Sequence, residues 1–292
     1  MVHFSGNKKL VLSVAINVML AFALSMLIYL VYPQFIYELD SVSKWTRYSV
    51  RTYRKYEGGM AYFEILMGPK EHFRQPQVPR RIYSYSGKQA FYVEIIGADM
   101  TGNGVTNLVI RQWNGSAHGD SRYLILELDD SVVDEIDVID GLLSVTFQDL
   151  NNDGTYEIKG VDRSYSYFLG DSHAASPRPS LVFSFDKTQA KFVPDKKLMS
   201  KPPLSQDQLD KLTLKYKNDP RWSKEFRPPS ELFDTMLGLI YSGNEKQAWE
   251  LFDASWSDVS KIPKQECKEA LEENLSESPF YPVIADWNKG KS

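Results

Sequence analysis

Two stretches of this chain, about 50 residues apart, share one pattern, and this repeat constrains the fold more than any other feature. Asp99 in "GADMTGNGVTNLVI" aligns with Asp149 in "QDLNNDGTYEIKG", 50 positions later. Gly104 aligns with Gly154 at the same spacing. A repeat of this length is typical of one structural unit that the chain uses twice, so we expect the two copies to share one local fold.

The region between Gly58 and Pro194 alternates apolar and polar residues in short runs that turn residues separate. This period of two is typical of half-buried strands, and an aromatic content of 13% with 17 tyrosines also favours β structure. We therefore expect a mainly β domain over residues 57–197, a duplicated antiparallel unit in the form of a sandwich or partial propeller. The eight predicted strand segments are 60–68, 80–87, 90–97, 106–113, 122–129, 142–149, 155–162 and 180–186.

An uncharged apolar run of 23 residues extends from Leu10 to Tyr32. A helix of that length rises about 34 Å, which is enough to cross a hydrocarbon core of about 30 Å. We expect residues 1–33 to form a short tail and a single-pass membrane anchor, with residues 10–32 in the bilayer. A cleaved signal peptide is the alternative. The bulk of the chain is expected to be periplasmic or extracellular.

Residues 34–56 follow the apolar run and mix aromatic, apolar and basic residues. We interpret them as a juxtamembrane segment, either a stalk or an amphipathic helix that lies near the lipid headgroups.

Helical patterns begin after a linker at residues 198–204 and define a helical module at 205–292. "PPSELFDTMLGLIYSGN" has a candidate cap at Ser230, and "EKQAWELFDASW" repeats the helical spacing, so the two predict a helical hairpin. This hairpin resembles part of a tetratricopeptide repeat, which implies a groove for a protein partner. The alternative is a helical cap packed on the β domain. The residues that carry the resemblance are Leu237, Gly238, Tyr241, Gly243, Ala248 and Phe252.

The stretch at 149–157 places oxygen-bearing residues at every second position. Alternate side chains can point into one concavity, and a glycine, Gly154, permits the tight turn. Ca²⁺ takes six to eight oxygen ligands and needs negative charge among them. The pattern predicts a structural calcium site, and the alternative is a turn whose Asn and Asp side chains only bind the backbone. The candidate ligands are Asp149, Asn151, Asp153, Thr155 and Glu157.

This loop is not an EF-hand, because the twelfth position is Gly160 where that loop needs an acid. It resembles the short DxDxDGxxD loop of FG-GAP and VCBS repeats, with Glu157 in place of the final Asp. The resemblance implies an extracellular calcium-binding loop between two strands of an integrin-like propeller. Stretches of the repeat are also similar to segments of bacterial envelope proteins.

The earlier copy of the loop has only one carboxylate, so we expect it to keep the turn and to bind Ca²⁺ weakly or not at all. Its candidate residues are Asp99, Thr101, Asn103 and Asn107.

Two histidines recur at matching places in the repeat, His118 in "GSAH" and His173 in "GDSH". Nearby serines and acids suggest an envelope hydrolase, but the spacing of a nucleophile elbow is missing. A net charge of −4 gives no basic footprint for nucleic acid, and one cysteine, Cys267, excludes an intrachain disulfide. We therefore expect a non-enzymatic binding or scaffold protein at the membrane, with the hydrolase as the alternative.

Overall fold

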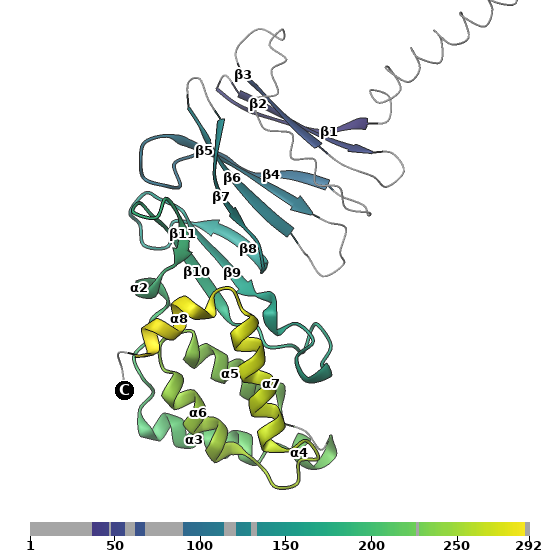
Figure 1. Ribbon diagram of the computed structural model, residues 1–292, viewed down its shortest axis with the longest axis vertical. Helices are drawn as coiled ribbons and strands as arrows, with labels where there is room; N and C mark the ends of the chain where they lie inside the picture. Colours follow the sequence, from purple (N-terminus) through teal and green to yellow (C-terminus); the bar gives the residue numbers. More distant parts are fainter. Residues whose placement is uncertain are drawn as a thin grey trace, which may run out of the picture. The chain divides into compact units, whose positions relative to one another are not determined.

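The computed structural model describes residues 37–46, 48–55, 62–67, 90–113, 121–129, 133–225 and 228–289 (Figure 1). The chain divides into two compact units, Met1–Phe91 and Tyr92–Ser292. The predicted anchor at 10–32 lies outside the described residues. None of the helices in the ranges above has both the length and the apolar character that crossing a bilayer requires.

The described part of the first unit is a three-stranded antiparallel sheet in the order β1-β2-β3. Its strands are β1 (Tyr37–Trp45), β2 (Tyr48–Lys55) and β3 (Tyr62–Met67). The expectation of an amphipathic helix at 34–56 was therefore wrong, because the described residues of this segment form β1 and β2. The juxtamembrane position of the segment remains a prediction. In β2 the side chains of Tyr48, Val50 and Thr52 are buried and alternate with more exposed neighbours, which is the period of a strand.

The second unit contains two four-stranded sheets, each an antiparallel meander whose strands follow one another in sequence (Figure 1). One sheet holds β4 (Ala90–Ala98), β5 (Thr106–Trp113), β6 (Ser121–Leu128) and β7 (Val133–Ile139). The other holds β8 (Leu142–Gln148), β9 (Glu157–Asp162), β10 (Ser180–Asp186) and β11 (Lys191–Pro194). The expected antiparallel β structure is confirmed, and the repeat in the sequence corresponds to two sheets of one topology. The described strands form no closed barrel.

Each copy of the repeated loop joins the first strand of its sheet to the second. Residues 99–105 connect β4 to β5, and residues 149–156 connect β8 to β9. Strand β7 was not among the predicted segments, because Asp134, Glu135 and Asp137 interrupt its apolar pattern. The predicted segment at 80–87 lies outside the described residues.

The chain beyond β11 is helical, as predicted. Ser205 caps α3 in a capping box, in which its Oγ accepts from the Gln208 backbone N–H and the Gln208 side chain accepts in return. Helix α5 begins at Ser230 with Pro229 at the cap position, one residue before the predicted cap. The helices are α2 (Lys196–Met199), α3 (Gln206–Lys217), α4 (Arg221–Lys224), α5 (Ser230–Ile240), α6 (Glu245–Ser255), α7 (Lys264–Glu277) and α8 (Tyr281–Asn288).

The helices and the second sheet share one hydrophobic core. Helices α5 and α6 pack on each other, as expected for a hairpin. The ring of Phe183 in β10 packs edge-on against Phe280, before α8, at a centroid distance of 5.3 Å. Phe168, after β9, packs in the same way on Phe233 of α5 at 4.9 Å. The helical region thus covers the β8–β11 sheet, which is the helical cap that the sequence left as an alternative.

A buried carboxylate joins the sheet to the helices. Asp162, at the end of β9, is 1% exposed and accepts hydrogen bonds from the hydroxyls of Tyr241 (2.6 Å) and Ser278 (2.5 Å). Burial, followed by the charge of Asp162, raises the pKa of Tyr241 far above its ordinary value, so this hydroxyl keeps its proton to donate. Tyr165 lies within hydrogen-bonding distance of Tyr241, at 3.1 Å between the two hydroxyls. A buried charge is tolerated only when partners of this kind satisfy it.

Candidate functional site

The loop at 149–156 is folded by hydrogen bonds from its own backbone to its acidic side chains. The Asp149 carboxylate accepts from the N–H groups of Asp153 (3.1 Å) and Gly154 (3.0 Å). The Asp153 carboxylate accepts from the Thr155 N–H at 2.8 Å and from the Thr155 hydroxyl at 2.5 Å. Successive N–H donors turn the chain around the carboxylates, so the predicted residues share one hydrogen-bonded loop.

Glu157 closes the loop from the first position of β9. Its carboxylate is buried and accepts from the Leu150 N–H at 2.7 Å and from the Asn151 amide nitrogen at 3.1 Å. The same amide nitrogen donates to the Asp153 carboxylate at 2.9 Å. A hydrogen-bond donor on Asn151 therefore lies between the carboxylates of Asp153 and Glu157.

The pKa values of these acids differ because their surroundings differ. Burial raises the pKa of Glu157, and the nearby charges of Asp153 and Asp149 raise it further, against the opposing bond from Leu150. Hydrogen bonds from the Thr155 side chain and backbone lower the pKa of Asp153. The loop is thus an anionic cluster in which a cation would relieve the repulsion at Glu157.

The oxygen atoms of this loop suit a hard cation as ligands, since they are carboxylate, amide, hydroxyl or carbonyl oxygens. As the side chains stand, no group of three or more His, Cys, Asp or Glu within the described ranges is arranged to hold a metal ion. The acidic oxygens are engaged by the N–H groups of their own loop instead.

The earlier loop, 99–107, repeats the same hydrogen bonds with fewer charges. The Gly104 N–H donates to Asp99 at 2.8 Å, and the Met100 N–H donates to the Asn107 side chain at 2.6 Å, as Leu150 does to Glu157. Burial raises the pKa of Asp99, but bonds from the Gly104, Gly102, Thr101 and Asn103 backbones outweigh it and leave the pKa lowered. Thr101 and Asn107 are buried, and the Asn107 amide reaches the Leu126 carbonyl at 3.5 Å. This copy keeps the turn and the acid at Asp99, but has the neutral Asn103 and Asn107 where the second loop has Asp153 and Glu157.

The two loops lie side by side. A Cβ placed on Gly102 would come within 2.9 Å of the Thr155 side chain, so only a glycine fits this close approach, and its φ of +68° favours glycine as well. Lys187, in the turn after β10, donates to the Gly102 carbonyl at 2.9 Å. The charge of Lys187 also lowers the pKa of Asp153. One lysine thus contacts one loop and acts electrostatically on the other.

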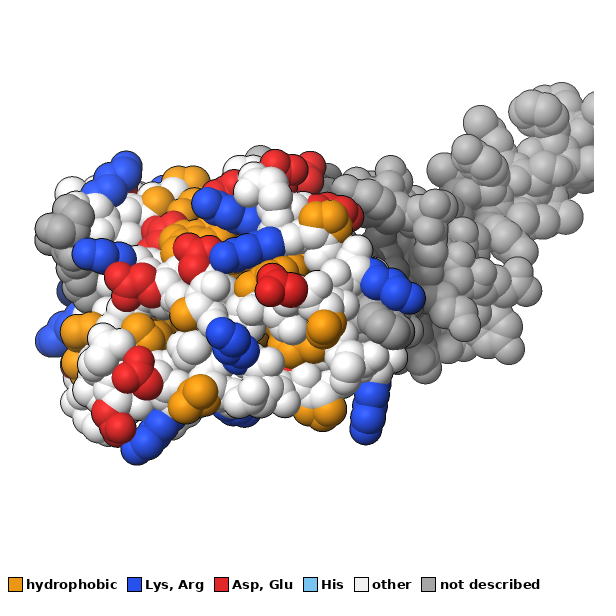
Figure 2. All heavy atoms as spheres, turned by 90° about the horizontal axis from the view of Figure 1, so that it is seen from below, with side chains coloured by type: hydrophobic (Ala, Val, Ile, Leu, Met, Phe, Trp, Pro, Cys, Tyr) orange, Lys and Arg blue, Asp and Glu red, His pale blue; other side chains and the backbone are white. Residues whose placement is uncertain are grey.

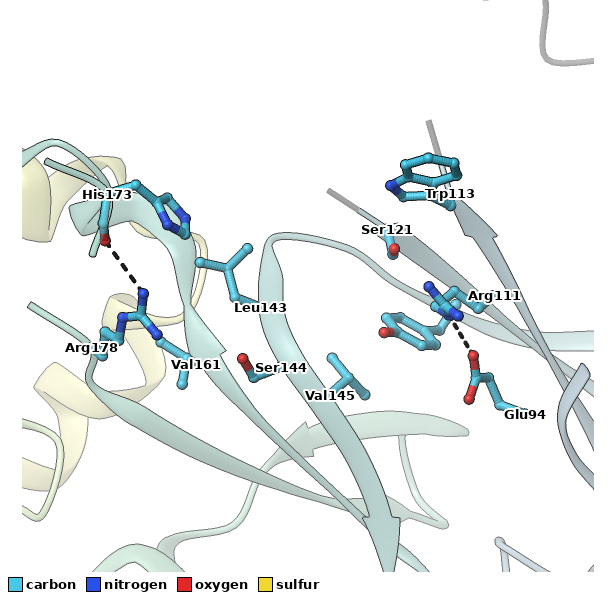
Figure 3. Close-up of a pocket in the computed structure, with 11 residues that line it drawn as sticks. Glu94, Arg111, Trp113, Ser121, Leu143, Ser144, Val145, Val161, His173 and Arg178 are labelled. Carbon is cyan, nitrogen blue, oxygen red and sulfur yellow. Dashed lines mark hydrogen bonds and ion pairs between the residues drawn. The ribbon is translucent and has the colours of Figure 1, made fainter. Parts of the chain in front are cut away.

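A pocket of about 420 Å³ opens between the two sheets of the second unit, where strands β5 and β9 end (Figure 3). His173 and Arg178 lie at one end of it, and Arg111 with Glu94 at the other. The loops at 99–105 and 149–156 lie at the opposite ends of these two strands, where β5 and β9 begin. Sequence analysis singled out His173 in this pocket but missed Arg111 and Arg178, which no motif marks. The remaining lining residues are Trp113, Ser121, Tyr123, Leu143, Ser144, Val145 and Val161.

The structure describes one of the two predicted histidines, His173, because His118 lies outside the described residues. The ring of His173 is tilted against that of Tyr167 at a centroid distance of 5.8 Å. Its carbonyl accepts a hydrogen bond from Arg178 at 3.4 Å (Figure 3). Among the residues drawn there, the two marked contacts are this bond and the Arg111–Glu94 ion pair, and neither involves a serine.

Comparison with models of protein families finds no match, and neither the curated proteins nor the solved structures contain a match to this chain. The likeness of the loop at 149–157 to FG-GAP and VCBS repeats, and that of the helical hairpin to a tetratricopeptide repeat, therefore remain predictions.

Proposed function

We propose that this protein is a membrane-anchored, extracytoplasmic binding or scaffold protein whose loop at 149–157 binds a structural Ca²⁺. The observation that carries the proposal is the cluster of Asp149, Asp153 and Glu157 around one turn. In that cluster the amide of Asn151 lies between two carboxylates. With Ca²⁺ bound, these four side chains and the Thr155 carbonyl would supply the oxygens, and the ion would supply the charge that offsets their repulsion.

Two further observations support this function. Two four-stranded meanders in succession, each with the loop after its first strand, suit the partial propeller that the strand pattern predicts. On the face in Figure 2, which is seen from the side of the helices, acidic and basic side chains are mixed. Exposed ion pairs on the helices include Lys211–Asp207 and Lys289–Asp286. A mixed surface of this kind suits a protein partner better than nucleic acid. The anchor at 10–32 rests on the sequence alone.

The test is thermal unfolding of the full chain in detergent, with EDTA or with millimolar CaCl₂. A ligand that binds only the folded state at 100 times its Kd stabilises it by about 2.7 kcal/mol, which raises Tm by roughly 5 to 10 °C for a unit of this size. We expect that rise in the wild type. Asp153→Ala should abolish it, because it removes a carboxylate from the cluster.

Asp186→Ala is the matched control. Asp186 also accepts backbone N–H bonds in a turn, from Thr188 at 2.7 Å and Gln189 at 3.1 Å, but it lies outside the loop. This variant should keep the full response to calcium. A wild-type Tm that calcium leaves unchanged would mean that the loop is only a hydrogen-bonded turn.

An envelope hydrolase that uses His118 or His173 is the alternative, and it has less support. The position of His173 at the edge of a pocket favours it, but the contacts drawn in Figure 3 do not couple that ring to a serine. Ester hydrolysis by the full chain that His173→Ala abolishes would establish the hydrolase and refute a purely scaffolding role.

A further inference from the structure

Three consecutive residues of β8, Leu143, Ser144 and Val145, line the pocket between the two sheets. A regular strand cannot do this, because successive side chains point to opposite faces. In β8 a bulge interrupts the pairing: Leu143 pairs with Val161, and the next paired residue is Thr146. The bulge therefore turns side chains toward the pocket that regular pairing would direct away from it.

The bulge places unusual backbone in β8 and a close approach opposite it in β9. Ser144 has a φ of +52°, in the left-handed region that residues other than glycine rarely adopt. Opposite it in β9, a Cβ on Gly160 would lie 3.0 Å from the Leu142 side chain, so the strands are close-packed there. Strained backbone of this kind is concentrated at binding and active sites, because local pairing alone does not favour it.

The charges in the pocket are unevenly compensated. Arg111 forms an ion pair with Glu94, and its guanidinium lies 4.4 Å from the centre of the Tyr92 ring. Arg178 donates from its guanidinium to a carbonyl, that of His173, at 3.4 Å. The Asp234 carboxylate is nearby but accepts from the Arg178 backbone N–H at 2.8 Å. Within the described part of the chain, no carboxylate lies within 4 Å of the Arg178 guanidinium.

Apolar and hydroxyl groups lie between the two arginines. Leu143 and Val145 stand on the β8 side of the pocket, and Trp113 stands across from them on the β5 side (Figure 3). Ser121 and Ser144 place hydroxyl groups beside this apolar surface. A volume of about 420 Å³ falls in the range of pockets that bind small molecules.

We propose that this pocket binds a small organic carboxylate, with the carboxylate group on Arg178 and the apolar body against Leu143, Val145 and Trp113. Apart from His173, the lining carries two arginines and one glutamate, a net charge of +1, which matches a single carboxylate better than a doubly charged phosphate. The guanidinium fork suits a planar carboxylate. The site does not depend on the acidic loops, which lie at the other end of the strands.

The test is fluorine NMR of the full chain in detergent with EDTA, using 4-fluorobenzoate and its neutral analogue 4-fluorobenzamide as probes. The benzoate signal should broaden and the benzamide signal should not, because the pocket selects for the charge. Arg178→Gln should weaken benzoate binding about tenfold or more, since a hydrogen-bonded ion pair is lost. Arg178 is exposed and its bond to Asp234 uses the backbone, so this variant should keep the wild-type Tm.

Lys191→Gln is the matched control, because Lys191 is an exposed cation of β11 outside the pocket. It should leave benzoate binding unchanged. The proposal is overturned if benzoate fails to bind, if benzamide binds as tightly, or if Arg178→Gln binds benzoate as well as the wild type does. Because EDTA is present throughout, these outcomes are separate from the calcium response of the acidic loop.

Discussion

Glu157 is the residue whose ionisation should affect the acidic loop most. It is 1% exposed, and burial together with the charges of Asp153 and Asp149 raises its pKa above the ordinary 4.5. The folded chain therefore binds this proton more tightly than the unfolded chain does. Ionisation of Glu157 therefore destabilises the folded chain. This destabilisation is absent well below pH 4.5, increases as the pH rises through the folded-state pKa of Glu157, and reaches its full size above that pKa.

Glu157→Gln should remove that pH dependence. In EDTA, the Tm of the wild type relative to the variant should fall as pH rises from about 4.5 to 7, because only the wild type acquires the buried charge. The measurement is a series of thermal melts of both proteins across this range. A wild-type Tm that rises relative to the variant with increasing pH would contradict the assignment.

Asp153→Asn provides the contrast at the same loop. In the wild type, hydrogen bonds from Thr155 lower the pKa of Asp153 below 3.8. The contribution of the Asp153 carboxylate to the free energy of unfolding is therefore present above pH 3.8 and is lost only at lower pH. Between pH 4.5 and 7 this variant should show a shallower pH slope than the wild type, because it removes one of the charges that raise the pKa of Glu157, and it should keep the part of the slope that burial of Glu157 causes. A slope like that of Glu157→Gln would mean that the two acids titrate as one group.

Two glycines test how closely the elements that carry them are packed. In β9, Gly160 faces Leu142 so closely that a Cβ would lie 3.0 Å from its Cδ1. In α5, a Cβ on Gly238 would meet nothing within 4 Å. The same substitution should therefore have opposite effects in a strand and in a helix.

Gly160→Ala should lower the free energy of unfolding by about 1 to 3 kcal/mol, because the added methyl group overpacks the bulge. Gly238→Ala should raise it by about 0.5 to 1 kcal/mol, because alanine favours the helix and reduces the entropy of the unfolded chain. Urea unfolding of both variants measures the two effects. Equal stability of the two variants would show that the close approach at Gly160 relaxes at no cost.

The elements differ in how far the sequence predicts them. Helix α5 and strand β5 were predicted because their apolar residues keep the period of their element. Strand β2 was misassigned, although Tyr48, Val50 and Thr52 alternate, because basic residues beside a predicted anchor suggested a lipid-facing helix. A count of period-two positions would have identified it.

The candidate sites also differ in how far the sequence predicts them. The acidic loop is local in sequence, so the spacing of Asp149 to Glu157 was enough to predict a turn that gathers their side chains. The pocket depends on Arg111 in β5, on Arg178 in the loop before β10, and on a bulge that the residue types do not predict. Only tertiary structure brings such residues together.

The helices and the β8–β11 sheet form one core, so the helical region should open only with that sheet. Cys267 in α7 reports on this, since it is buried, and burial followed by the charge of Glu266 raises its pKa from 9.0 to about 12. Without opening, the thiolate fraction at pH 7 is lowered about a thousandfold, and the thiolate is the reactive form.

Maleimide labelling of Cys267 should therefore be very slow in buffer and complete within minutes in concentrated urea, as measured by mass spectrometry. The control is Cys267→Ala combined with Glu273→Cys, which places an exposed thiol on the same helix. That thiol should label rapidly in both conditions. Rapid labelling of native Cys267 would mean that α7 detaches from the core while the sheet remains folded.

The buried carboxylate of Asp162 has a consequence for the order in which the chain is made. It accepts from Ser278, which follows it by 116 residues. At roughly 5 to 20 residues per second, a ribosome needs about 6 to 23 s to add that interval. Throughout this time β9 carries a charge whose last donor has not yet been synthesised. A nascent chain can pair its strands early, but the hydrogen bonds to Asp162 are complete only when the segment that leads into α8 has been made.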